Sequence, residues 1–125
     1  MILDTNALSA FFAGDKGAVD KLASANRLYL PVIVLGEYRY GLMGSRKRKE
    51  WGPQLMAFAG TCSVLPVQES TTLSYARIRN HLRKAGTPIP ENDIWIAALA
   101  MEYGQPILSR DSHFDQVPQI ERLGY

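Results

Sequence analysis

Short apolar segments alternate along the chain with longer segments in which apolar residues recur at three- and four-residue spacing. The short segments predict buried strands, and the longer ones predict amphipathic helices. The strands are expected at residues 1–4, 28–30, 62–65 and 106–108, with a weaker one at 120–123. The helices are expected at residues 6–12, 17–25, 31–44, 50–59, 69–85 and 92–103.

Strands that alternate with helices are typical of strand-helix-strand units, in which helices cover both faces of a parallel sheet. We therefore expect an α/β fold with three layers and a central parallel sheet of four to five strands. A chain of 125 residues with 46% hydrophobic content can build one core. No linker or repeat divides the sequence, so we expect a single domain over residues 1–125.

The composition of the chain indicates where the protein is found in the cell and which metal ligands it can offer. No apolar run approaches the roughly 18 residues of a membrane span, and the first residues lack a basic and apolar leader pattern. We therefore expect no membrane association and a cytoplasmic location. Cys62 is the only cysteine beside two histidines, which argues against an internal disulfide and the usual structural zinc site. Any metal is expected to be bound by oxygen.

Two aspartates follow predicted strands. Asp4 ends the first strand, and Asp111 lies three residues beyond the fourth. Because sites in parallel sheets form at the carboxyl ends of the strands, we expect the two side chains to converge. Structural roles are the alternative, with Asp4 as the N-cap of the next helix and Asp111 as an ordinary turn residue.

Glu37 lies on an apolar stripe of the third predicted helix. Its neighbours four and three positions earlier are Ile33 and Val34. A lone carboxylate in such a setting loses hydration energy, so it must be protonated, paired with a cation or directed into a cleft. The structural alternative is an ion pair with Arg39 or Arg110.

Asp93 lies in the first turn of the last predicted helix, on the side that it shares with Ile96 and Ala97. It is therefore expected to point along the buried face and out of the amino-terminal end of the helix. The helix dipole favours an ionised side chain there, which is also a purely structural explanation for the residue. Asn92 is expected to cap this helix.

Several carboxylates brought together are unfavourable unless protons or cations offset their charge. Oxygen ligands without thiolates suit Mg²⁺, with Mn²⁺ as a substitute, and Mg²⁺ takes part of its ligand shell from water and phosphate. The expected chemistry is the hydrolysis of a phosphodiester bond by a metal-activated water. Because water is the nucleophile, the carboxylates alone do not distinguish RNA from DNA.

Four segments become recognisable as an ordered set: ILDTN at 2–6, the helix that carries Glu37, NDIWIAA at 92–98 and LSRDSHF at 108–114. Over essentially the whole chain they resemble the PIN-domain ribonuclease toxins of toxin-antitoxin modules, the VapC-like family. The resemblance implies a magnesium-dependent endoribonuclease that forms a homodimer and is inhibited by a cognate antitoxin. It also implies that the joint complex binds operator DNA through the antitoxin. The metal-binding residues implied by this match are Asp4, Glu37, Asp93 and Asp111.

The resemblance also implies supporting residues. Asn6 and Ser109 match positions that hydrogen-bond the acids or the substrate. The last acid varies within the family, so Asp115 is an alternative or additional metal ligand to Asp111.

Other charged residues carry weaker information. The basic run of residues 46–49 either contacts RNA phosphates or forms a solvated loop, and the two readings are weighed equally. We assign no role to His81 and His113. The members of the basic run are Arg46, Lys47, Arg48 and Lys49.

Two other functions compete with a nuclease. A phosphatase of the haloacid dehalogenase type also begins with a strand ending in aspartate, but it needs a second aspartate two residues on, where this chain has Asn6. We therefore reject the phosphatase. The second competitor is a catalytically silent RNA-binding or regulatory module, in which the acids serve only as caps and ion pairs. Dependence of RNA cleavage on a divalent metal would separate the two.

Overall fold

The structure is a computed structural model that describes all residues, 1–125. Its five short strands form one sheet in the order β3-β2-β1-β4-β5, and every neighbouring pair is parallel. The predicted parallel sheet of four to five strands is thereby confirmed. The strands are β1 (Ile2–Leu3), β2 (Tyr29–Pro31), β3 (Ser63–Leu65), β4 (Ile107–Leu108) and β5 (Arg122–Leu123).

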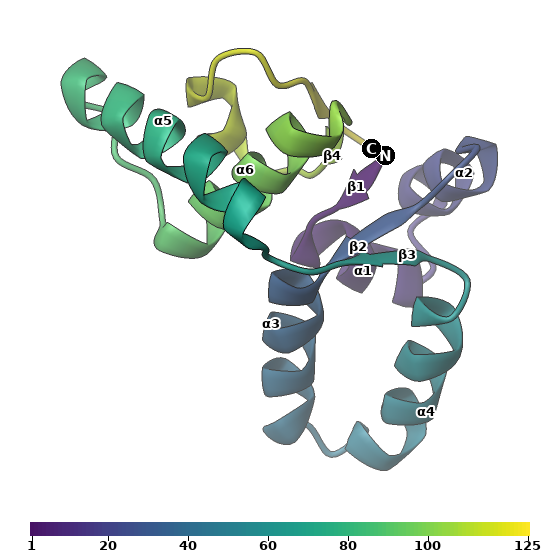
Figure 1. Ribbon diagram of the computed structural model, residues 1–125. Helices are drawn as coiled ribbons and strands as arrows, with labels where there is room; N and C mark the ends of the chain where they lie inside the picture. The colour runs from purple at the N-terminus through teal and green to yellow at the C-terminus, as the bar shows by residue number, and fades with distance from the viewer.

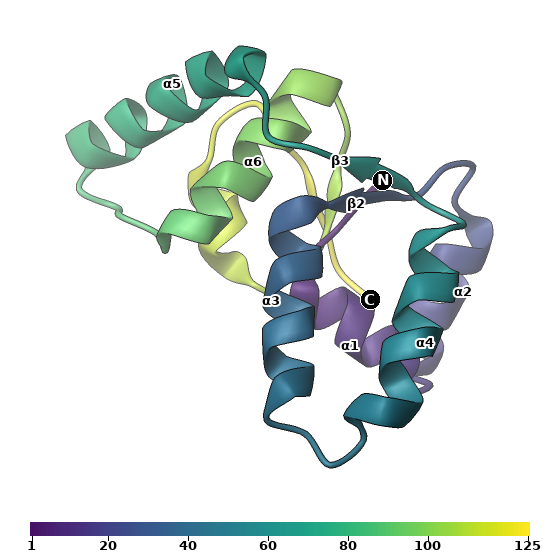
Figure 2. The same cartoon turned by 60° about the horizontal axis from the view of Figure 1, so that its bottom comes forward.

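Helices lie on both faces of this sheet, so the molecule has three layers (Figure 1). One face is covered by α5 and α6, and α1 and α2 lie on the other (Figures 1 and 2). A short 3-10 helix, η1, follows the fourth strand. The helices are α1 (Thr5–Phe12), α2 (Lys16–Ser24), α3 (Val32–Met43), α4 (Arg48–Ala59), α5 (Glu69–Ala85), α6 (Glu91–Tyr103) and η1 (Ser112–Gln116).

The two central strands divide their side chains between two apolar clusters. Ile2 and Ile107 belong to the larger cluster, which includes the buried residues of α5 and α6. Leu3 and Leu108 belong to the smaller one, together with Leu22 of α2. Successive strand residues point to opposite faces, and both faces here are covered, which explains why β1 and β4 are entirely apolar.

Helix α6 is apolar nearly all round because it is enclosed between the sheet and α5. Its residues from Ile96 to Ala100 are almost completely buried. On the α5 side, the rings of Tyr75 and Trp95 stack with their centroids 3.9 Å apart. Trp95 therefore packs between α6 and α5.

Five of the six predicted helices begin one or two residues away from the expected position, and α6 and α4 show the physical reasons. Helix α6 begins at Glu91 with Pro90 at the N-cap position and no side-chain cap, so the prediction that Asn92 caps it is wrong. The rigid ring of Pro90 holds an extended backbone, φ −54° and ψ 145°, that leads directly into the helix. Helix α4 begins at Arg48, two residues earlier than predicted, and continues through Pro53. None of the helices is long and apolar enough to span a bilayer.

Candidate active site

The candidate site lies between β1 and β4, at the carboxyl ends of the two strands. From β1 the chain adds β2 and β3 on one side of the sheet, and β4 and β5 on the other. Parallel sheets open a crevice where the strand order reverses in this way. Asp4 directly follows β1 and Ser109 directly follows β4, so both residues lie at this crevice.

Asp4 is nearly buried, with 5% of its surface exposed, and it accepts three hydrogen bonds. Thr5 N donates to Oδ1 at 2.8 Å, while Asn6 Nδ2 at 3.0 Å and Ser109 Oγ at 2.6 Å donate to Oδ2. Burial raises the pKa of Asp4, and these hydrogen bonds oppose the shift. Asp4 is also the N-cap of α1, so it has the structural role considered for it and lies at the crevice as well.

Asn6 and Ser109 join the segment after β1 to the turn after β4. Asn6 Nδ2 donates to Ser109 Oγ at 3.0 Å, and Asn6 Oδ1 accepts from Arg110 N at 3.0 Å. Ser109 Oγ also accepts from Asp111 N at 2.9 Å. These hydrogen bonds fix the position of Asp4 relative to Asp111, although the two residues are more than 100 positions apart in the sequence.

Asp93 enters the site from the first turn of α6. His113 Nδ1 lies 3.1 Å from Asp93 Oδ2 and 2.9 Å from Asp111 Oδ1, so the imidazole bridges the two carboxylates. Burial raises the pKa of Asp93 to about 6, with the negative charges of Asp4 and Asp111 adding to the rise and His113 opposing it. The dipole of α6, expected to favour the ionised form, is outweighed by this burial and crowding.

Asp111 has a local structural role as well. Its Oδ1 accepts a hydrogen bond from His113 N at 2.9 Å and thereby caps η1. The side chain is about one-third exposed, which leaves it accessible from the crevice. Like Asp4, Asp111 therefore both caps a helix and lies among the acids of the crevice.

Glu37 reaches the site from α3. Its Oε2 accepts from the Thr5 hydroxyl at 3.1 Å, and Thr5 N also donates to Asp4, so Thr5 links the two acids. Glu37 Oε1 is buried and has no hydrogen-bond partner. Neither arginine considered as an ion-pair partner is engaged with Glu37. Arg39 contacts Met56 and Arg110 binds Asp15, so the ion-pair alternative is wrong.

Asp115 is held away from the cluster. Its two carboxylate oxygens each accept a hydrogen bond of 2.8 Å from the guanidinium of Arg122. This paired geometry satisfies the carboxylate and holds its pKa below the usual range. The structure therefore favours Asp111 as the acid contributed by this segment.

The basic run lies at the turn between α3 and α4 and in the first turn of α4. Arg46 and Lys47 precede α4, and Arg48 and Lys49 form its first turn. Lys47 and Glu37 line the same cavity of about 270 Å³, which is also bordered by Trp51. Within this run, Lys47 is thus the residue that shares a cavity with a member of the acidic cluster.

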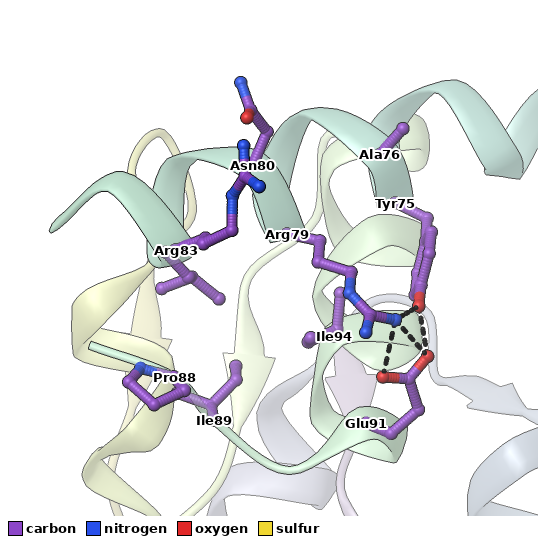
Figure 3. A pocket seen from close by; sticks show the side chains of 10 residues that line it. Tyr75, Ala76, Arg79, Asn80, Arg83, Pro88, Ile89, Glu91 and Ile94 are labelled. Carbon is purple, nitrogen blue, oxygen red and sulfur yellow. Dashed lines mark hydrogen bonds and ion pairs between the residues drawn. The ribbon is translucent and has the colours of Figure 1, made fainter. Parts of the chain in front are cut away.

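A cavity of about 700 Å³ lies apart from Asp4, Asp93 and Asp111, between α5 and the segment leading into α6 (Figure 3). Arg79 and Glu91 form an ion pair of 3.1 Å at one end of it, beside the ring of Tyr75 (Figure 3). Its floor includes Ile89 and Ile94. This ion pair lies at the surface, with more than half of each side chain exposed.

One residue at the site was not anticipated from the sequence. No role was assigned to His113, yet it lies in contact with both Asp93 and Asp111. The available signal was its position in the polar turn after a strand, two residues beyond a candidate ligand.

The residues present fit a divalent cation. Ligand atoms of Asp93, Asp111 and His113 all lie within 4.8 Å of one another, a span that the ligands of one ion can have. The buried Oε1 of Glu37 lacks a partner, and such an atom is costly to leave unsatisfied. Burial, with a smaller contribution from the neighbouring acids, raises the pKa values of Asp4 and Asp93, and a bound cation would favour their ionised forms.

A model of the PIN domain matches residues 1–120. The chain belongs to the PIN domain family. This confirms the resemblance inferred from the ordered motifs and the α/β fold class.

Two PIN domain relatives cover most of the chain. The VapC ribonuclease Y4jK of Sinorhizobium fredii is 32% identical over 127 residues, which covers 90% of this chain and 87% of that protein. Ribonuclease VapC5 of Mycobacterium tuberculosis is 29% identical over 116 residues, which covers 90% of this chain and 84% of that protein.

Solved structures support the same PIN domain fold. VapBC-5 of Mycobacterium tuberculosis, a member of the VapBC toxin-antitoxin family, superposes with a TM-score of 0.78 at 28% identity, covering 99% of this chain and 97% of that one. VapBC2 of Rickettsia felis, solved bound to a DNA fragment from its promoter, gives a TM-score of 0.89 at 23% identity, covering 99% and 97%. The second likeness shows the fold alone.

Proposed function

We propose that this PIN domain is the toxin of a type II toxin-antitoxin system and acts as a magnesium-dependent endoribonuclease. The observation that carries the proposal is the convergence of Asp4, Asp93 and Asp111 at the sheet crevice, where the imidazole of His113 bridges Asp93 and Asp111. The names of its relatives, which are VapC ribonucleases, support RNA as the substrate.

Each acid has a distinct place in the proposed chemistry. Asp93 and Asp111 face each other across His113 and would bind the ion, while Asp4 is held beside them by Asn6 and Ser109. When bound, a divalent cation supplies activation of water and neutralisation of the charge that develops on the phosphate. Glu37 is linked to Asp4 through Thr5, and its second carboxylate oxygen has no competing protein donor.

Lys47 is the proposed contact for an RNA phosphate. Its side chain brings a positive charge to the cavity that Glu37 also lines, and phosphate contacts are made by such basic side chains. Arg46, Arg48 and Lys49 add positive charge at the same turn. Binding that depends on these residues would weaken as salt concentration rises.

The partners are proposed from the relatives. Structures of similar chains are toxin-antitoxin complexes, and that of Rickettsia felis is bound to promoter DNA. We therefore propose a cognate antitoxin and a complex that reaches operator DNA through it. The homodimer and the inhibition by the antitoxin, which the family resemblance implies, are proposed with it. A toxin that cleaves cellular RNA would act in the cytoplasm.

The proposal is tested by RNA cleavage with Asp4→Asn and Asp93→Asn variants in Mg²⁺. Both are expected to lose about 100-fold or more of the activity, because each removes a charge at the ion. Asp20→Asn is the matched control, because Asp20 is exposed on α2 and does not belong to the acidic cluster of Asp4, Asp93 and Asp111. Replacement of Mg²⁺ by Mn²⁺ is expected to preserve cleavage.

If the chain is instead a silent RNA-binding or regulatory module, in which the acids serve only as caps and ion pairs, no RNA cleavage is expected. This alternative draws support from the caps that Asp4 and Asp111 provide to α1 and η1. If RNA binds but is not cleaved in either metal, the silent module is the correct function. Cleavage that persists in excess chelator would contradict the metal-dependent enzyme.

A further inference from the structure

The imidazole of His113 lies where two candidate metal-binding carboxylates meet. Its Nδ1 is 3.1 Å from Asp93 Oδ2 and 2.9 Å from Asp111 Oδ1. The side chain is 46% exposed, so the imidazole lies at the mouth of the crevice and not within the core.

The backbone on both sides of His113 is anchored. Its own N–H donates to Asp111 Oδ1 at 2.9 Å, and the next residue, Phe114, is 1% exposed within the main apolar cluster. η1 therefore presents the imidazole to the acids from a defined position. A ring on a loose loop would not be constrained in this way.

We propose that His113 is itself a ligand of the divalent cation, through Nδ1, together with Asp93 and Asp111. The three ligand atoms lie within 4.8 Å of one another, and no other histidine or cysteine belongs to this group. Histidine is a common metal ligand through either ring nitrogen. The inference rests on the proposed function only in requiring a divalent ion at the carboxylates.

A nitrogen ligand changes which ion the site prefers. Sites made of oxygen alone suit Mg²⁺, whereas imidazole favours transition-metal ions, whose affinities for nitrogen exceed that of Mg²⁺. The site should therefore prefer Mn²⁺ to Mg²⁺, and this preference should come from His113. The oxygen-only site expected from the sequence would show no such dependence on a histidine.

The test uses the full chain without RNA, loaded with Mn²⁺ and with its histidines labelled with ¹⁵N. Pulsed electron paramagnetic resonance detects histidine nitrogen directly bound to Mn²⁺, and calorimetry gives the affinities for Mn²⁺ and Mg²⁺. His113→Gln is compared with His81→Gln, which replaces the other histidine, exposed on α5.

The wild type and His81→Gln are expected to show coupling of Mn²⁺ to one histidine nitrogen, and His113→Gln is expected to lose it. The affinity of His113→Gln for Mn²⁺ should fall about 10-fold, the lower end of the range for altering a ligand environment. Its affinity for Mg²⁺ should fall less. Unchanged near-ultraviolet circular dichroism would show that the fold is retained.

Mn²⁺ bound to the wild type without histidine coupling would overturn the proposal, as would coupling that survives in His113→Gln. Failure of the wild type to bind Mn²⁺ would overturn it as well. The wild-type spectrum decides the matter even if the variant does not fold. Because RNA is absent, a chain that binds Mn²⁺ through His113 but cleaves no RNA would retain this inference and lose only the proposed enzyme.

Discussion

At the scale of single residues, the acids of the candidate site lower the stability of the folded chain at neutral pH. Asp93 begins a helix, where the dipole stabilises a negative charge, yet its pKa is raised to about 6. Burial and the neighbouring acids therefore make the ionised form of Asp93 unfavourable in the folded chain. In the unfolded chain the same carboxyl titrates near its usual value.

The sign of the resulting pH dependence follows from this difference. Since the folded pKa is higher than 3.8, protonated Asp93 adds stability that is complete below about pH 3.8 and is lost as pH rises through about 6. At about 1.4 kcal/mol for each pKa unit, the loss is up to about 3 kcal/mol at neutral pH. Crowded acids thus weaken the metal-free protein.

We predict that Asp93→Asn is more stable than the wild type at pH 7.5 in the presence of a chelator. The rise in Tm should be roughly 5–10 °C, because the amide retains the shape of the side chain without its charge. The difference should vanish at pH 3.5, and Asp20→Asn should show no comparable gain at either pH. Thermal unfolding followed by circular dichroism measures both, and a less stable Asp93→Asn at pH 7.5 would contradict the assignment.

At the scale of elements, a helix boundary can be predicted from the sequence where a residue with a strong backbone preference marks it. Helix α5 was predicted at 69–85 and is found there, because Gly86 takes a left-handed conformation, φ +69°, that few other residues adopt. The start of α6 was harder, since Pro90 stands at the N-cap without a side-chain bond. η1 was not predicted because its five residues are too few for any periodicity.

The role of Gly86 can be tested against a glycine within a helix. Gly86→Ala should lower the free energy of unfolding by about 1 kcal/mol, because alanine is strained at positive φ. Gly36→Ala should instead raise it by about 0.5–1 kcal/mol, since Gly36 lies within α3 and an added Cβ meets nothing within 4 Å. Urea unfolding measures both, and shifts of the same sign would refute the distinction.

At the scale of the whole molecule, the parallel sheet brings distant acids together. The places of Asp4 and Asp111 could be predicted because carboxyl ends of parallel strands share one edge. The bridging position of His113 could not, because it depends on the turn of η1 and on the caps around it. The bond from Thr5 to Glu37 likewise depends on the angle at which α3 leaves the sheet. The single domain over residues 1–125 stays a prediction.

Divalent ions are predicted to stabilise the whole fold. An ion that binds only the folded chain adds about 2.7 kcal/mol at a free concentration about 100 times its Kd. Thermal unfolding in Mg²⁺ should therefore occur at a higher Tm than in chelator, and Asp93→Asn should gain less than the wild type. Equal Tm values for the wild type with Mg²⁺ and with chelator would show that no ion binds the acids.

The hydrogen bond of Ser109 to Asp4 joins residues 105 positions apart. Since a ribosome delivers the chain from its amino terminus, Asp4 emerges long before Ser109, Asp111 and His113 exist. Every nascent fragment that stops short of β4 lacks half of the crevice. Under the proposed function, fragments that end before β4 are therefore expected to cleave no RNA, because they lack Ser109, Asp111 and His113.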